Sequence, residues 1–321
     1  MARVLVVGRI HEAGIARLRA EPGLSVETLD ETERGALERA LSAAEAVIVR
    51  TAPLPGPSIA AAPRLAVIAK HGVGYDNIDV AAATARGIPV TVTATANATS
   101  VAEFTWAQIL ALAKLSRAMD AAVRAGDWDA RHRLVPLELA DKTLLVVGFG
   151  RIGTRVARRA LAFEMRVSVF DPYVSAERIL AAGCEPVASL DDALARADVV
   201  TLHCPLTAET RAIVDRARLG RLRPGALLVN TARGGLVDEA ALVAALHEGR
   251  LGGAALDATV REPLPVNDPL LGAPGLLLSP HVAGVTAESA RRMALEAAEN
   301  VLAGLAGRLR PEVVVNPEVL R

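Results

Sequence analysis

The sequence predicts an α/β protein built from two doubly wound parallel-sheet domains, one inserted into the other. Three observations lead to this prediction. Short apolar runs alternate with amphipathic helical stretches along most of the 321 residues, which is the pattern of βαβ units. A glycine-rich turn lies between two such runs near the middle of the chain. A final helical stretch, about 287–305, has no strand left to pair with, so we expect it to pack back onto the first domain.

The first domain begins with four short apolar runs that we expect to be strands. Amphipathic stretches near 11–20, 33–43 and 78–86 separate these runs, as helices covering a parallel sheet would. Together with the last helix they predict a flavodoxin-like substrate domain made of residues 1–98 and 286–321. The predicted strands are 4–7, 46–49, 65–69 and 90–93.

A long helical pattern, from about Ser100 to Arg124, joins this domain to the second. Six further apolar runs with helical crossovers follow, which is the strand count of a full Rossmann domain. We expect this domain to span residues 99–285, with the two chain crossings forming a hinge around a cleft. The predicted strands are 144–147, 167–170, 199–203, 226–230, 253–257 and 276–278.

The segment 144–171 carries the strongest functional signal. Gly148, Gly150 and Gly153 stand at G-x-G-x-x-G spacing after an apolar run, and a helical stretch follows. Such glycines allow a tight turn, close approach of a pyrophosphate and packing of the helix on the strand, while the helix N-terminus binds phosphate. Asp171, after the next run, can accept hydrogen bonds from ribose hydroxyls and would repel a 2′-phosphate. NAD is therefore predicted rather than NADP. The alternative interpretation of the glycine motif is a βαβ turn that requires glycines for its conformation and binds no dinucleotide.

Composition narrows the class of protein. The formal net charge is zero and aromatic residues make up 2%, which disfavours nucleic-acid and membrane-surface partners. No apolar run approaches the roughly 18 residues of a membrane span. The N-terminus lacks the pattern of a signal peptide. Cys184 and Cys204 are far apart, so we expect free buried thiols in a reducing cytoplasm and no metal site.

Three polar segments follow predicted strands of the second sheet, at the edge where open α/β sheets bind ligands. They contain Arg233, Glu262 and His281, and a fourth segment, 70–79, lies in the first domain. These side chains suit reduction of a 2-keto acid. His281 would donate the proton, Glu262 would orient the imidazole, and Arg233 would bind the carboxylate and the carbonyl oxygen. Arg50, after a strand of the first domain, could bind a carboxylate or phosphate.

The chain contains the motifs HGVGYDNID, NATSVAE, GFGRIG, VFDP, HCPLT, NTARGG, ALD followed by EP, and SPHVAG. Their order and spacing resemble those of the D-isomer-specific 2-hydroxyacid dehydrogenases. The resemblance spans essentially the whole chain, and the phosphoglycerate dehydrogenase and hydroxypyruvate/glyoxylate reductase branches look most similar. It implies that Arg233, Glu262 and His281 are the catalytic residues. It also implies a homodimer formed through the cofactor domains, with the helix 100–124 and the segment after it at the interface.

The same resemblance implies residues that bind substrate and cofactor. Backbone N–H groups of Gly72, Val73 and Gly74 would bind the substrate carboxylate, beside Arg50, Arg233 and His281. The expected cofactor-binding residues are Gly148, Gly150, Arg151, Ile152, Gly153, Asp171, His203, Pro205, Thr231, Ala232 and Asp257.

Some positions depart from the family pattern and leave the substrate open. Ala258 and Thr259 replace an apolar or aromatic pair, and Phe104 stands where several members carry histidine. Glu262 disfavours formate, because formate enzymes carry glutamine there. The candidates are 3-phosphoglycerate, glycerate or hydroxypyruvate, glyoxylate and bulkier 2-keto acids. The cluster Arg131–Arg133 is either a solvated face or a ligand for a neighbouring subunit's substrate phosphate.

One alternative function remains for the whole chain. A dinucleotide-sensing binding protein of the corepressor type would share this fold. It would need a peptide-docking surface and flexible extensions, neither of which the sequence indicates. The complete set of Arg233, Glu262 and His281 favours the enzyme.

Overall fold

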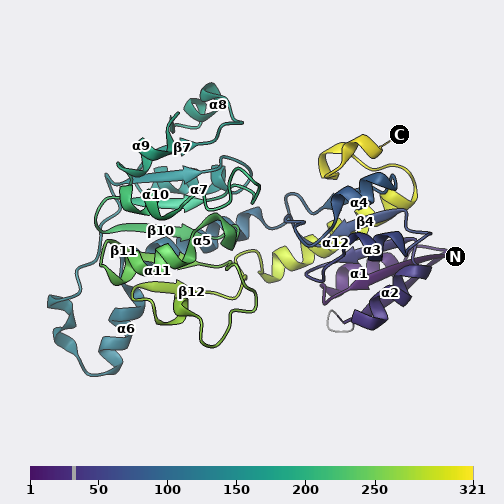
Figure 1. The fold of residues 1–321 in the computed structure, drawn as a ribbon, viewed down its shortest axis with the longest axis horizontal. Helices are drawn as coiled ribbons and strands as arrows, with labels where there is room; N and C mark the ends of the chain where they lie inside the picture. Colours follow the sequence, from purple (N-terminus) through teal and green to yellow (C-terminus); the bar gives the residue numbers. More distant parts are fainter. Residues whose placement is uncertain (31–33, 321) are drawn as a thin grey trace. The chain divides into compact units, whose positions relative to one another are not determined.

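The computed structural model describes residues 1–30 and 34–320. The chain divides into two compact units, which we call the first unit (residues 1–97 and 285–321) and the second unit (residues 98–284). Each unit is a parallel sheet with helices on both faces, as predicted for a doubly wound fold (Figure 1). Within the described ranges, no helix combines the length and the apolar character that crossing a bilayer requires.

The first unit contains a five-stranded sheet of order β2-β1-β3-β4-β5, the flavodoxin-like order, which confirms the predicted fold class. The sequence indicated four of these strands and missed β2. That strand lies at the sheet edge with no fully buried residue, so it lacks the continuous apolar run that marks the others. The strands are β1 (Ala2–Val7), β2 (Leu24–Leu29), β3 (Ala46–Val49), β4 (Val67–Lys70) and β5 (Val90–Val92).

Helices cover both faces of this sheet. One face packs against α1 (Glu12–Arg19) and α12 (Ala287–Leu305), with Leu18 and Val301 among the buried residues. Gly14 lets α1 approach α12 closely, since a Cβ there would lie 2.5 Å from the carbonyl oxygen of Ala294. The other face packs against α2 (Arg34–Ala43), α3 (Gly56–Ala60) and α4 (Val80–Ala85). Residue 33, the predicted start of the second helix, lies outside the described residues.

The second unit contains a seven-stranded sheet of order β12-β11-β10-β9-β6-β7-β8, in which every pairing is parallel. Counted from β6, this is the Rossmann order 3-2-1-4-5-6 with one strand added at the edge. The sequence indicated six of the seven strands. It missed β8 because that strand has only two residues. The strands are β6 (Thr143–Val147), β7 (Arg166–Phe170), β8 (Glu185–Pro186), β9 (Val199–Leu202), β10 (Ala226–Asn230), β11 (Leu251–Leu256) and β12 (Leu276–Leu278).

Two apolar cores fill the two faces of this sheet. One contains α5 (Ala98–Ala113), α7 (Gly153–Ala162) and α8 (Ala176–Ala181). The other contains α9 (Leu190–Leu194), α10 (Arg216–Arg221) and α11 (Glu239–His247). Short 3-10 helices complete the fold: η1 (Trp128–His132), η2 (Gly234–Leu236), η3 (Pro269–Gly272), η4 (Pro311–Val313) and η5 (Pro317–Val319).

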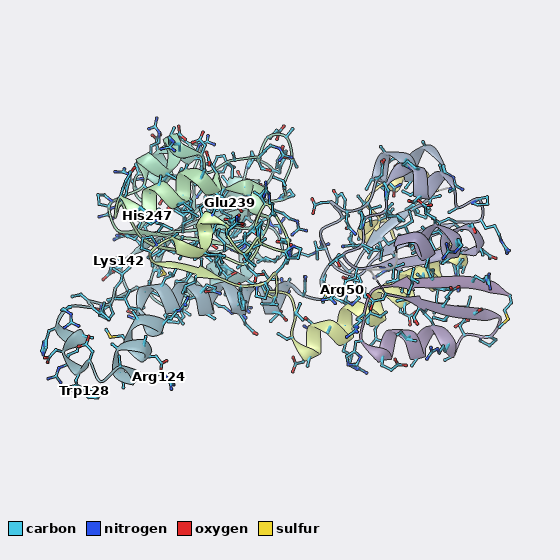
Figure 2. All side chains as sticks on the ribbon, turned by 60° about the horizontal axis from the view of Figure 1, so that its bottom comes forward. Arg50, Arg124, Trp128, Lys142, Glu239 and His247 are labelled. Carbon is cyan, nitrogen blue, oxygen red and sulfur yellow. The ribbon has the colours of Figure 1, made fainter. Side chains whose placement is uncertain are left out.

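The long helix expected over 100–124 is instead two helices, α5 and α6 (Ser116–Arg124). Leu115 between them adopts a left-handed conformation with φ of 51°, which ends the first helix without a glycine or proline to announce it. No residue of α6 is buried, and Figure 1 shows α6 extending away from the sheet of the second unit. Val123 on α6 and Trp128 on η1 are both more than half exposed. Figure 2 shows Trp128 near the outer end of this projection.

Candidate functional site

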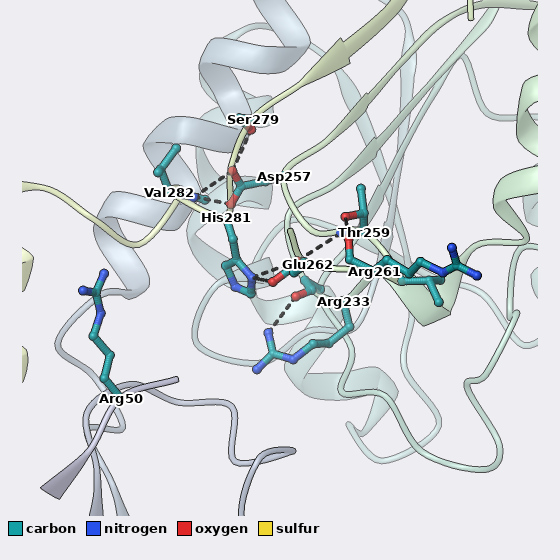
Figure 3. Close-up of polar contacts among 12 residues, drawn as sticks. Arg50, Arg233, Asp257, Thr259, Arg261, Glu262, Ser279, His281 and Val282 are labelled. Carbon is teal, nitrogen blue, oxygen red and sulfur yellow. Dashed lines mark hydrogen bonds and ion pairs between the residues drawn. The ribbon is translucent and has the colours of Figure 1, made fainter. Parts of the chain in front are cut away.

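The carboxyl ends of three neighbouring strands meet at one edge of the second sheet. Arg233 follows β10, Asp257 and Glu262 follow β11, and Ser279 and His281 follow β12. Because these strands are parallel and adjacent, the loops beyond them lie side by side (Figure 3). The structure thus brings together the three side chains that the sequence marked for catalysis.

His281 and Glu262 form a hydrogen-bonded pair. His281 Nδ1 lies 2.8 Å from Glu262 Oε2 and 3.1 Å from Oε1. A carboxylate can only accept, so Nδ1 carries the hydrogen and Nε2 is left to take up or release a proton. Partial burial alone would raise the pKa of the Glu262 carboxyl. The hydrogen bond from His281, the N–H of Thr259 and the charge of Arg233 outweigh this and hold that pKa below its ordinary value.

The backbone around His281 is fixed by a buried carboxylate. Asp257 is 3% exposed. Its carboxylate accepts hydrogen bonds from Ser279 Oγ at 2.6 Å and from the N–H groups of Val282 and Ala283 at 2.9 and 2.8 Å. His281 itself is left-handed, with φ of 53°, and its N–H donates to the carbonyl oxygens of Asp257 and Ser279. A left-handed backbone is uncommon for a residue with a side chain and persists only where the surroundings fix it. The hydrogen bonds around His281 fix its backbone, and the imidazole is thereby held in place.

The Arg233 turn is held by the residue that ends β10. The Asn230 side chain donates to the carbonyl oxygen of Arg233 at 2.8 Å and accepts from the N–H of Ala232 at 3.0 Å. Gly234 then allows the turn to lie directly on the β11 loop, since a Cβ there would come within 2.1 Å of the carbonyl carbon of Thr259. The three loops therefore support one another.

The glycine turn after β6 fits a dinucleotide pyrophosphate. Gly148 has φ of 98°, and a Cβ there would lie 2.7 Å from the N of Cys204. At Gly153 a Cβ would lie 2.0 Å from the carbonyl oxygen of Gly148, so the helix α7 packs closely on the turn. At Gly150 an added Cβ would meet nothing within 4 Å, which leaves open space beside the backbone where a phosphate is expected.

Asp171 and His203 flank this turn with polar groups suited to a cofactor. Asp171 accepts from the N–H of Phe149 at 2.7 Å and of Tyr173 at 2.9 Å, which fixes its carboxylate beside the glycines. His203 Nε2 lies 2.9 Å from Thr201 Oγ1, whereas its shielded Nδ1 has no partner among the described residues. Burial lowers the pKa of His203 to about 3, so the ring is neutral.

The remaining predicted cofactor residues differ in exposure. Thr231 is buried, and its hydroxyl lies 2.9 Å from that of Thr105 on α5. Ile152 packs against the core behind α7. Arg151 and Pro205 are exposed, and Ala232 is half-buried. Every one of them lies in a loop at the carboxyl end of a strand in the second sheet.

The predicted substrate loop of the first unit follows β4. The N–H of Gly72 donates to Thr93 Oγ1 at 3.0 Å, so this group is already engaged. Arg50 Nη1 donates to the carbonyl oxygen of Arg9 at 3.2 Å. His71 is buried, and burial together with the charges of Arg50 and Lys70 lowers its pKa to about 4.

Other predicted groups have simple surroundings. Arg131 and His132 are hydrogen-bonded to each other, and Arg133 pairs with Asp127; all are exposed. Both cysteines are free, but only Cys184 is buried; Cys204, expected to be buried, is partly exposed. Burial raises the pKa of the Cys204 thiol to about 11. Over residues 1–30 and 34–320, no group of three or more His, Cys, Asp or Glu side chains could hold a metal ion.

Three residues that organise the site escaped the sequence analysis: Asn230, Ser279 and Glu239. Asn230 and Ser279 lie within recognised motifs, and a polar residue at the end of an apolar strand is the signal that could have found them. Glu239 is the first residue of α11, where an acidic residue is common. Nothing in the sequence indicates its contact with the N–H of Val260, 21 residues away.

Comparisons with known proteins identify the family of the chain. A family model described as D-isomer specific 2-hydroxyacid dehydrogenase, NAD binding domain, matches residues 106–283. A D-3-phosphoglycerate dehydrogenase of Mycobacterium tuberculosis is 40% identical over 98% of this chain, which spans only 60% of that relative's length. A glyoxylate reductase of Korarchaeum cryptofilum is 38% identical, with 99% and 97% of the two chains covered. The crystal structure of D-lactate dehydrogenase from Aquifex aeolicus, complexed with NAD and lactic acid, has a TM-score of 0.89, 31% identity and coverage of 98% and 99%.

Proposed function

Because the chain belongs to the D-isomer specific 2-hydroxyacid dehydrogenase family, we propose that it interconverts a small D-2-hydroxy acid and its 2-keto acid, with NAD as cofactor. The observation that carries this proposal is the His281–Glu262 pair, which stands beside Arg233 on the same sheet edge as the glycine turn. NAD supplies or accepts the hydride when it is bound. The residues proposed to hold it are those of the glycine turn, Asp171, His203, Pro205, Thr231, Ala232 and Asp257.

The chain's own residues perform the proton chemistry. During reduction, His281 Nε2 donates a proton to the oxygen of the former carbonyl, and during oxidation it removes the proton of the hydroxyl. Glu262 stabilises the imidazolium through the Nδ1 hydrogen bond. Arg233 offers a planar fork to the substrate carboxylate and to charge on the reacting oxygen. Since the Gly72 N–H is engaged, we assign the N–H groups of Val73 and Gly74 as the main backbone donors to the carboxylate.

For the substrate we propose 3-phosphoglycerate or the glycerate, hydroxypyruvate and glyoxylate group. The relative named D-3-phosphoglycerate dehydrogenase supports the first option. The relative named glyoxylate reductase supports the second. If the substrate carries a phosphate, Arg50 or the cluster Arg131–Arg133 is its proposed ligand. Both sites offer arginine side chains, which bind phosphate well. Arg50 is half-exposed and the residues of the cluster are exposed.

We also propose a homodimer formed through the second units, located in the cytoplasm. The helix α6 buries none of its residues, and Val123 and Trp128 are 56% and 64% exposed, which favours a partner on this surface. Two free cysteines accord with a reducing compartment. No observation favours the corepressor alternative, because the reported relatives are named as enzymes.

The test is NADH oxidation against hydroxypyruvate, glyoxylate, phosphohydroxypyruvate, pyruvate and branched or aromatic 2-keto acids, with NADPH in parallel. We expect turnover of at least one of them and a preference for NADH. His281→Ala should lower kcat by about 100-fold or more, because general acid–base catalysis contributes that much. His247→Ala, an exposed histidine at the end of α11, serves as the matched control (Figure 2). Full activity of the His281 variant, or no turnover of any acid while NADH binds, would contradict the proposal.

A further inference from the structure

The loop that carries Glu262 is held from behind by a second carboxylate. Glu239, the first residue of α11, accepts a hydrogen bond from the N–H of Val260 at 2.7 Å through its Oε1. Its side chain is half-buried. Glu239 is labelled in Figure 2. Capping of α11 does not require it, since Asp238 already accepts from the N–H of Ala241 at 2.9 Å. The carboxylate of Glu239 is therefore directed to the loop rather than to its own helix.

Hydrogen bonds and the close backbone contact with Gly234, rather than buried side chains, fix residues 259–262. Val260 is 62% exposed, and Arg261 and Glu262 are also exposed, so no apolar side chain of the loop anchors it. The N–H of Thr259 donates to Glu262 Oε1 at 3.1 Å, and the hydroxyl of Thr259 donates to the carbonyl oxygen of Arg261 at 2.7 Å. These two bonds lie within the loop. The hydrogen bond from the N–H of Val260 to Glu239 ties the peptide between Thr259 and Val260 to α11.

We propose that Glu239 is a positioning residue, which clamps the 259–262 loop so that Glu262 meets His281 and whose negative charge favours the protonated imidazole. This inference rests on the proposed acid–base role of His281. Among the described residues the hydrogen bond of Glu239 goes to Val260 and that of His281 Nδ1 to Glu262, so we infer that Glu239 acts through Val260 and Glu262.

The charges around the clamp agree with this role. Glu262 and Asp268 face Glu239, while His281 and Arg233 face Glu262. Partial burial, followed by the charges of Asp268 and Glu262, raises the pKa of the Glu239 carboxyl, although the bond from Val260 opposes this. A second negative charge thus stands behind the carboxylate that faces His281. Removing it should make the imidazolium less favourable.

The experiment separates the clamp from the charge with two substitutions. Glu239→Gln keeps an oxygen that accepts from Val260 but removes the charge, whereas Glu239→Ala removes both. For 2-keto acid reduction, Glu239→Ala should lower kcat roughly tenfold or more, because small displacements of reacting groups cost that much. The KM for NADH should not change. Glu239→Gln should restore most of kcat and move the basic limb of the pH profile to lower pH. Glu248→Gln, an exposed position at the end of the same helix, should match the wild type.

Each outcome decides the inference. Full kcat in Glu239→Ala with an unchanged pH profile in Glu239→Gln would overturn it and leave the proposed function standing. Equal losses of kcat and NADH affinity in Glu239→Ala, without rescue by Glu239→Gln, would show a general structural role instead. If Glu239→Ala fails to fold, the pH profile of Glu239→Gln decides alone. A wild type that reduces no 2-keto acid would remove the proposed function itself, and the inference with it.

Discussion

The two units hold the loops at their sheet edges with buried charges of opposite sign. In the second unit, Asp257 is 3% exposed and its carboxylate accepts three hydrogen bonds from the 279–283 segment. We call Asp257 the negative anchor, and Lys70 of the first unit the positive anchor. In the first unit, Lys70 is 8% exposed, and its ammonium donates to the carbonyl oxygen of Arg50 and to Asn77 Oδ1. The Asn77 side chain in turn donates to the carbonyl oxygen of Ala52 at 2.7 Å.

A buried charge is costly unless it is fully hydrogen-bonded, so its sign calls for a reason beyond stability. The negative anchor stands beside His281, which the proposed reaction requires in its protonated form. The positive anchor stands at the start of the 70–79 loop, which we propose binds a carboxylate. In both units the anchor thus carries the charge opposite to the one that its loop is proposed to hold.

Removal of the negative anchor should give the largest effect. Asp257→Ala leaves three donors without a partner, and hydrogen bonds to charged groups are worth about 1.5–3 kcal/mol each. We expect a loss of stability of about 3 kcal/mol or more in denaturant unfolding. With His281 no longer held, kcat should fall by about 100-fold.

The matched control is Asp192→Ala, an exposed carboxylate in the same unit, which should change neither quantity. If Asp257→Ala loses stability but keeps kcat, the carboxylate is only structural. Asp257 would then have no role in the proposed reaction, unlike the role that we propose for Lys70.

Acid should destabilise both units, because each contains a neutral histidine, buried at His71 and partly buried at His203. The pKa of His203 is lowered to about 3 by burial, and that of His71 to about 4 by burial and then by the charges of Arg50 and Lys70. The unfolded pKa, near 6.5, is the higher one, so the unfolded chain binds more protons and stability falls as pH drops below it. Each histidine should cost about 2 kcal/mol between pH 7 and pH 5.

Denaturant unfolding at the two pH values measures this loss. His71→Asn and His203→Asn should each flatten the pH dependence, and the exposed His132→Asn should not. A pH dependence that is the same in all three variants would show that other groups govern the acid response.

The fold was largely predictable because the buried strands are apolar and β-branched. Val4–Val7 and Leu144–Val147 illustrate this, and they define the two sheets. The edge strands β2 and β8 were missed because an edge strand need not be apolar on both faces. The break at Leu115 was missed because its left-handed conformation is imposed by the fold rather than by the residue type.

The candidate site divides in the same way. The meeting of Arg233, Glu262 and His281 at one sheet edge was predictable because each follows a recognisable strand. Their supports were not, because the bonds of Glu239 to Val260 and of Lys70 to Arg50 join segments about 20 residues apart. Such contacts depend on how two loops meet, which neither periodicity nor spacing encodes.

The positive anchor should give the smallest effect, and one of a different kind. Lys70→Met keeps the length and shape of the side chain but removes the ammonium from the carbonyl oxygen of Arg50 and from Asn77. The 70–79 loop then loses both its tether and its nearby positive charge. We expect the KM for the 2-keto acid to rise roughly tenfold, the worth of one such hydrogen bond, with kcat and the KM for NADH little changed. Lys142→Met, in the second unit, is the matched control. Lys70→Met should thus change KM, whereas Asp257→Ala should change kcat. If Lys70→Met lowers kcat instead of raising KM, the charge of Lys70 does not serve substrate binding. The opposite signs of the two anchors would then have no common explanation.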